Sequence, residues 1–130
     1  MVNNTGKKRI LVVEDEQFLR DLYVELLTEE GYDVDSAADG EEGYKKIHDG
    51  YYDLILLDIV LPKKDGLAVL EDLKSNPPKK PSKAIIVLSN LGHEAVISEG
   101  VSLGIRGHII KSDYTPDQLL AEVKKVIDES

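Results

Sequence analysis

The residues best suited to chemistry in this sequence are polar side chains that directly follow short apolar runs. They are Glu14, Asp15, Asp58, Ser89 and Lys111. In an open parallel α/β sheet, ligands bind outside the carboxyl ends of the strands. If each apolar run is a strand, these side chains meet at one edge of the sheet and are the first candidates for a shared site.

The residue types in this set suit the transfer of a phosphoryl group. Carboxylates at one edge repel one another, and oxygen ligands of this kind favour a hard cation such as Mg²⁺. Lys111 would add a positive charge and Ser89 a hydroxyl donor, as a transferring phosphoryl group requires. A carboxylate such as Asp58 can act as the nucleophile and form an aspartyl phosphate.

Each of these residues also has a simpler interpretation. Glu14 and Asp15 can cap the helix that follows them, and Asp58 can be a loop residue bonded to backbone amides. Taken singly, Ser89 is a turn serine and Lys111 a surface lysine. The combination of all five at strand ends is what favours phosphoryl chemistry.

Five apolar runs predict the strands that would position the site. Three strong runs do not alternate polar with apolar residues, which is typical of central parallel strands covered on both faces: Ile10–Val13, Leu54–Leu57 and Ala84–Leu88. Two weaker runs are Val34–Ala37 and His108–Ile110.

Helical spacing between these runs predicts five helices. The first covers Phe18 to Leu27 and ends at Gly31, and the last begins with Thr115 as cap and Pro116 in the first turn. Weaker patterns span about Glu41–His48, Asp65–Ser75 and Glu94–Leu103. The alternation predicts an α/β fold of the (βα)₅ type, with the proline-rich segment Asn76–Pro81 as a surface loop.

Composition fits one globular module of 130 residues, with 42% hydrophobic and 32% charged residues. There is no cysteine, which excludes disulfides and fits a reducing compartment, so a cytoplasmic location is expected. No apolar stretch approaches the ~20 residues of a membrane helix. We therefore expect no membrane span. The formal charge of −9 would repel a phosphate backbone, so we also expect no direct binding to nucleic acid.

The motifs resemble a known family, the receiver domains of two-component response regulators. The resemblance covers Lys8 to about Ile127 and rests on four segments: Ile10–Asp15, Leu56–Gly66, Val87–Ser89 and Ile109–Lys111. Asp58, Pro62 and Gly66 reproduce the family's D-x-x-x-P-x-x-x-G pattern. The resemblance implies a doubly wound, flavodoxin-like fold whose five-stranded parallel sheet has the order 2-1-3-4-5, with helices on both faces.

The resemblance also implies roles for the candidate residues. Asp58 would accept a phosphoryl group from the phosphohistidine of a sensor histidine kinase or a phosphotransfer protein. Glu14 and Asp15 would hold Mg²⁺ together with Asp58 and the backbone carbonyl of Val60. The chain would then be a phosphoacceptor that assists its own phosphorylation and slow dephosphorylation, and not an enzyme in the ordinary sense.

The output side of the site is implied in the same way. Lys111 would pair with the carboxylate or the phosphoryl group, and Ser89 would move to bond a phosphoryl oxygen. This movement would switch the face built from the fourth helix, fifth strand and fifth helix, where a downstream protein target would bind.

Two positions depart from the family's pattern. His108 stands where receivers usually carry Tyr or Phe as a rotameric switch, and we take as a hypothesis that it makes the switch sensitive to pH. Ser112 replaces the proline that usually follows the lysine, so a trans peptide bond is expected there. These departures keep open a degenerate receiver that serves only for docking.

Rival classes lack their motifs. A hydrolase of the haloacid dehalogenase type needs a second Asp two residues after the nucleophile, where this chain has Val60, and neither common phosphate-binding glycine motif occurs. We expect a disordered N-terminal segment over residues 1–7 and one receiver domain over residues 8–130. We further expect that this domain is a stand-alone protein.

Overall fold

The structure is a computed structural model that describes residues 6–90 and 94–129. Its strands are β1 (Arg9–Val13), β2 (Asp33–Ala37), β3 (Leu54–Asp58), β4 (Ile85–Ser89) and β5 (Gly107–Ile110). Its helices are α1 (Gln17–Glu29), α2 (Gly40–Asp49), α3 (Gly66–Ser75), α4 (Glu94–Ser102) and α5 (Pro116–Asp128). A short 3₁₀ turn, Lys111–Asp113, precedes α5.

The strands form one parallel sheet in the order β2-β1-β3-β4-β5. The three strong apolar runs are its central strands, and the two weaker runs are its edges, where the side chains are partly exposed. The predicted flavodoxin-like (βα)₅ fold and its strand order are therefore confirmed.

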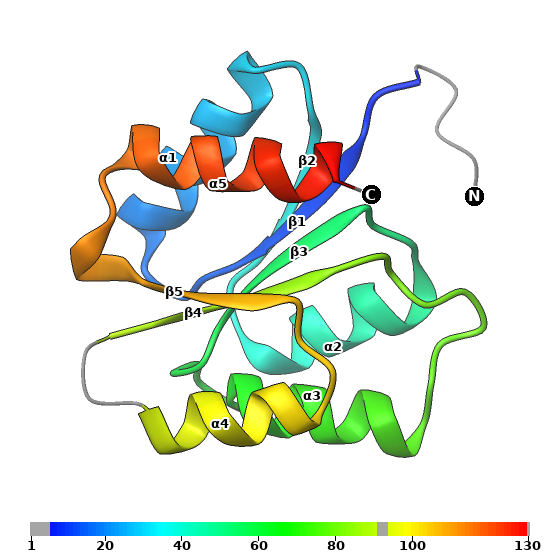
Figure 1. The fold of residues 1–130 in the computed structure, drawn as a ribbon. Coiled ribbons are helices and arrows are strands. Elements are labelled where there is room, and N and C mark those ends of the chain that lie inside the picture. The colour runs from blue at the N-terminus through cyan, green and yellow to red at the C-terminus, as the bar shows by residue number, and fades with distance from the viewer. Residues whose placement is uncertain (1–5, 91–93, 130) are drawn as a thin grey trace.

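Helices cover both faces of the sheet. Figure 1 shows α1 and α5 on one face and α2, α3 and α4 on the other. Alternate residues of β1 serve the two cores: Ile10 and Val12 pack with α1 and α5, whereas Leu11 and Val13 pack with α2, α3 and α4. All four side chains are fully buried. A shift of β1 by one residue in register would move each of them to the opposite face of the sheet, which the packing of the two cores does not tolerate.

The helix ends follow the predicted caps. Gly31 has a φ of 101° just beyond α1, a conformation that glycine adopts without steric cost. At the start of α5, the Thr115 hydroxyl accepts a hydrogen bond from the Gln118 amide, and the Gln118 side chain accepts one from the Thr115 amide. Pro116 occupies the first helical position, as predicted.

Two details differ from the sequence prediction. Asp58 and Ser89 were expected just after their strands but are the last residues of β3 and β4, because both remain paired in the ladder, opposite Leu88 and Ile110. The 3₁₀ turn that begins at Lys111 was not predicted, whereas the expected trans bond to Ser112 is found. Residues 1–5 lie outside the described part, so the predicted domain boundary stays a prediction.

Candidate functional site

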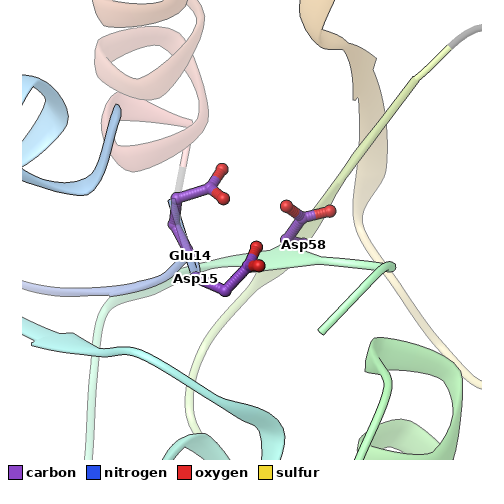
Figure 2. A group of neighbouring side chains, drawn as sticks. All are labelled: Glu14, Asp15 and Asp58. Carbon is purple, nitrogen blue, oxygen red and sulfur yellow. The ribbon is translucent and has the colours of Figure 1, made fainter. Parts of the chain in front are cut away.

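Three carboxylates gather where β1 and β3 end. Figure 2 shows Glu14 and Asp15 rising from the end of β1 and Asp58 from the end of β3. One oxygen of each lies within 4.8 Å of the others. The strands are direct neighbours with Val13 opposite Leu57, so the residues that follow this pair must meet.

Burial makes two of these carboxylates costly to leave without compensation. Glu14 is 1% exposed and Asp58 is 4% exposed, whereas Asp15 faces solvent. A buried carboxylate is tolerated when a cation or hydrogen-bond donors replace the lost water. The site therefore requires positive charge.

Lys111 supplies part of this positive charge. It follows β5, two strands from β3, and its Nζ donates to Glu14 Oε1 at 2.6 Å and to Asp58 Oδ2 at 2.5 Å. Burial acts to lower the pKa of Lys111, but the hydrogen bonds and negative charges of Asp58 and Glu14 outweigh it and raise this pKa. Lys111 is therefore firmly held as a cation.

Backbone amides occupy the remaining oxygens of the buried pair. The Glu16 amide donates to Glu14 Oε2 at 3.1 Å, and the Val60 amide donates to Asp58 Oδ1 at 3.2 Å. The Val60 side chain itself is 56% exposed. Each buried carboxylate thus has one oxygen on a backbone amide and the other on Lys111.

Ser89 ends β4, the strand beside β3, and lies buried at 1% exposure. Its hydroxyl has no hydrogen-bond partner among the described residues. An unsatisfied buried hydroxyl costs about 1–3 kcal/mol, so this side chain is suited to a ligand oxygen that arrives at the strand ends.

Gly66 allows the chain to fold back tightly after Asp58. Its amide donates to the Ile59 carbonyl at 2.8 Å. A Cβ atom at Gly66 would lie 2.3 Å from the Asp58 carbonyl oxygen and 2.9 Å from Ile59 Cα, too close for any side chain. Steric exclusion of a side chain therefore explains why a glycine stands at this position of the D-x-x-x-P-x-x-x-G pattern.

Arg20 is a site residue that the sequence prediction missed. Its Nη1 donates to the Glu14 carbonyl at 2.9 Å and to the Asp15 carbonyl at 3.3 Å, from the first turns of α1. It fixes the backbone of the acidic pair and adds positive charge behind it. The available signal was an arginine five residues after Asp15, which looks like an ordinary surface charge.

Tyr23, also missed, packs below the site. Its side chain is buried, and burial raises the pKa of its hydroxyl, with the Glu14 and Asp58 charges acting in the same direction and Lys111 against them. The hydroxyl stays protonated beside the carboxylates.

His108 is not brought to the carboxylates. It is exposed on β5 and lines a small cleft against α5 together with Glu122 and Lys125. The hypothesis that His108 acts as a pH-sensitive switch stays untested.

The donor set fits a hard divalent cation. Glu14, Asp15 and Asp58 offer only oxygen ligands, and one of them faces solvent, which leaves room for the waters that Mg²⁺ retains. The single charge of Lys111 offsets only part of the charge of three carboxylates. A further cation is therefore electrostatically favourable here.

Comparison with known proteins agrees with this geometry. A family model described as "Response regulator receiver domain" matches residues 10–124. The chain belongs to this family. Receivers are signalling domains of two-component systems, in which they interact with histidine kinases and downstream effectors.

Two curated relatives illustrate the range of proteins that contain similar receivers. The chain is 40% identical over 116 residues to the transcriptional regulatory protein DltR of Streptococcus agalactiae. The matched residues are 89% of this chain and 50% of DltR. The chain is 37% identical over 112 residues to the chemotaxis protein CheY of Treponema pallidum. The matched residues are 83% of this chain and 75% of that protein. The receiver spans about half the length of the transcriptional regulators that it matches.

Solved receivers share the fold. A CheY-like receiver domain protein from Methanospirillum hungatei superimposes with a TM-score of 0.83 at 31% identity, over 95% of this chain and 96% of that one. The response regulator TrrA from Thermotoga maritima, solved in complex with Mg²⁺-BeF, gives 0.76 at 39% identity over 92% and 98% of the two chains. Among the described helices, none has the length and apolar character needed to cross a bilayer.

Proposed function

We propose that this receiver accepts a phosphoryl group on Asp58 from the phosphohistidine of a sensor histidine kinase or a phosphotransfer protein. The observation that carries the proposal is the meeting of three carboxylates at the strand ends, two of which, Glu14 and Asp58, bind Lys111. Among the three carboxylates, Asp58 occupies the middle of the sheet and has the Val60 amide on one oxygen and Lys111 on the other. It can therefore present an oxygen to phosphorus while its charge stays compensated.

In the proposed transfer, an Asp58 oxygen forms a bond to phosphorus while the bond from phosphorus to the donor's imidazole nitrogen breaks. The nitrogen keeps the electron pair of that bond and takes up a proton. Lys111 moves from the carboxylate onto the phosphoryl oxygens, and the Ser89 hydroxyl donates to one of them. The Val60 amide remains beside the reacting oxygen, and Arg20 keeps the acidic pair in place.

The metal belongs to the same proposal. Glu14, Asp15, Asp58 and the Val60 carbonyl would hold Mg²⁺. Mg²⁺, when bound, supplies positive charge beside the phosphoryl oxygens. The complex of the similar regulator TrrA with Mg²⁺-BeF supports this assignment by analogy.

The signal leaves the site through β4 and β5 in this proposal. Phosphorylation adds charge and strong acceptors next to Lys111, which follows β5, and next to Ser89, which ends β4. The Ser89 hydroxyl has no hydrogen-bond partner in the described part of the chain. Along the chain, β4 is followed by α4, and β5 is followed by α5. We assign the face that α4, β5 and α5 form to a downstream protein partner. The cytoplasmic location and the stand-alone state stay predictions.

Intact mass spectrometry tests the acceptor chemistry. Acetyl phosphate with Mg²⁺ should add a phosphoryl group, a gain of ~80 Da, to the wild type and leave Asp58→Asn unchanged. Asp21→Asn is the matched control, because Asp21 is an exposed carboxylate on α1 outside the site. A docking module without phosphoryl chemistry would show no gain in any variant.

A further inference from the structure

The structure carries a second cleft, at the end of the sheet opposite the carboxylates. We propose that this cleft binds a small molecule that combines an apolar body with one anionic group. The cleft lies between the C-terminal ends of α3 and α4 and the α3–β4 connection. The ribbons of these three segments can be followed in Figure 1. The proposal does not depend on phosphorylation of Asp58.

The size and lining of the cleft suit such a ligand. Its volume is about 480 Å³, within the ~300–1,000 Å³ of small-molecule sites. Its walls are mainly apolar, with Leu70 and Leu73 from α3, Pro78 from the connection, and Leu103 after α4. Ile85 is only partly buried although it starts a central strand, because this end of β4 faces the cleft.

The wall formed by the α3–β4 connection is held in place before any ligand binds. Pro77, Pro78 and Pro81 restrict its backbone. The Ser82 hydroxyl accepts from the Tyr52 amide at 3.0 Å, and the Lys83 amide donates to the Tyr52 carbonyl at 3.0 Å. These bonds tie the connection to the start of β3, so a ligand would pay little conformational entropy to use the cleft.

Charge selects the anionic group. Among the described residues that line the cleft, Lys74 is the charged one. Lys74 is exposed, and its ammonium has no hydrogen-bond or ion-pair partner in the described part of the chain. In a chain with a net charge of −9, Lys74 places one positive charge beside this apolar surface.

A matched pair of fluorescent probes separates the apolar and anionic contributions. The anion 8-anilinonaphthalene-1-sulfonate and the neutral N-phenyl-1-naphthylamine share one aromatic body and differ in the sulfonate. We expect the anionic probe to bind more tightly than the neutral one. In ¹H–¹⁵N spectra of the protein, the amide shifts that change on binding of the anionic probe should centre on Leu73, Ile85 and Leu103.

Two variants with equal loss of charge test the role of Lys74. Lys74→Gln should weaken binding of the anionic probe by about two- to fivefold, the range that an exposed ion pair supports, and leave the neutral probe unchanged. Lys125→Gln, on α5 at the other face of the sheet, should change neither affinity. Both positions are exposed, and circular dichroism of each variant verifies its fold.

Three results would overturn the proposal. The first is no saturable binding of the anionic probe. The second is shift changes that centre elsewhere, for example on the cleft of about 340 Å³ beside Lys111 that Tyr23 and Tyr114 line. The third is equal weakening by Lys74→Gln and Lys125→Gln, which would mean that net charge and not this cleft attracts the anion.

Discussion

At the scale of single residues, the site depends on one lysine between two buried carboxylates. Lys111 Nζ lies 2.6 Å from Glu14 Oε1 and 2.5 Å from Asp58 Oδ2, and its side chain is 13% exposed. Removing one partner from such a group leaves uncompensated buried charge, which costs more than the intact pair gains.

Lys111→Met should therefore destabilise the metal-free protein by about 3 kcal/mol, because Glu14 and Asp58 then repel each other without a cation. Mg²⁺ should raise the stability of this variant more than that of the wild type, since the metal replaces the missing charge. Urea unfolding with and without Mg²⁺ measures both effects. Lys45→Met, at an exposed position of α2, is the control, and an equal response to Mg²⁺ in wild type and Lys111→Met would contradict the account.

Asp35 on β2 predicts a second residue-scale effect, on stability against pH. Burial acts to raise the pKa of its carboxyl, but hydrogen bonds from the Lys46 ammonium, the Ser36 amide and the Tyr52 hydroxyl outweigh it and hold this pKa below the ordinary 3.8. A lowered pKa in the folded state stabilises the protein above the ordinary value, and this contribution disappears as the pH falls through the folded-state pKa.

Asp35→Asn should accordingly be less stable than wild type at pH 7, and the difference should shrink as the pH falls below 3.8 and through the lowered folded-state pKa of Asp35. The Asp35 side chain is 38% exposed, so screening limits the effect to less than about 1 kcal/mol. Urea midpoints across this pH range provide the measurement. Asp21→Asn should run parallel to wild type, and a constant offset of Asp35→Asn at every pH would refute the assignment.

At the scale of elements, the tight connection from β3 to α3 positions the site. Gly66→Ala places a methyl group 2.3 Å from the Asp58 carbonyl oxygen, so the backbone that carries Asp58 and Val60 must shift. We expect a loss of about 2 kcal/mol of stability and weaker Mg²⁺ binding.

Gly107→Ala is the matched control for this element, because no atom lies within 4 Å of the methyl position at Gly107. The stability of the Gly107→Ala variant should stay at the wild-type level or rise slightly. Chemical denaturation and Mg²⁺ titration of both variants decide the question, and wild-type behaviour of Gly66→Ala would exclude a steric role for this glycine.

The elements themselves were largely predictable. Continuous apolar runs indicated β1, β3 and β4, and the caps at Gly31 and Thr115 indicated where α1 ends and α5 begins. The 3₁₀ turn at Lys111 has no such signal, because it depends on where the lysine must reach. Arg20 was missed for a similar reason, since its partners are backbone carbonyls whose directions a sequence does not show.

At the scale of the whole molecule, strand order was the part that local patterns did not determine. Apolar runs predict strands but not their neighbours, and the order 2-1-3-4-5 came from the family resemblance. Once the order is known, the meeting of Glu14, Asp15 and Asp58 follows from the pairing of β1 with β3. The bridge from Lys111 to Glu14, across three intervals between strands, required the structure.

The two ends of the molecule have different chemistry. The carboxyl ends of the strands carry the acidic site, and the opposite end carries an apolar cleft with Lys74 on its rim. The receiver matches about half the length of regulators such as DltR, so the kinase and the output partner are proposals.

The most direct test of the central claim is to locate the phosphoryl group. After reaction with acetyl phosphate and Mg²⁺, borohydride reduces an aspartyl phosphate to homoserine, and tandem mass spectrometry of peptides then identifies the modified position. We expect homoserine at position 58 and at no other acidic residue. Homoserine at Asp15 or elsewhere, with Asp58 unmodified, would contradict it.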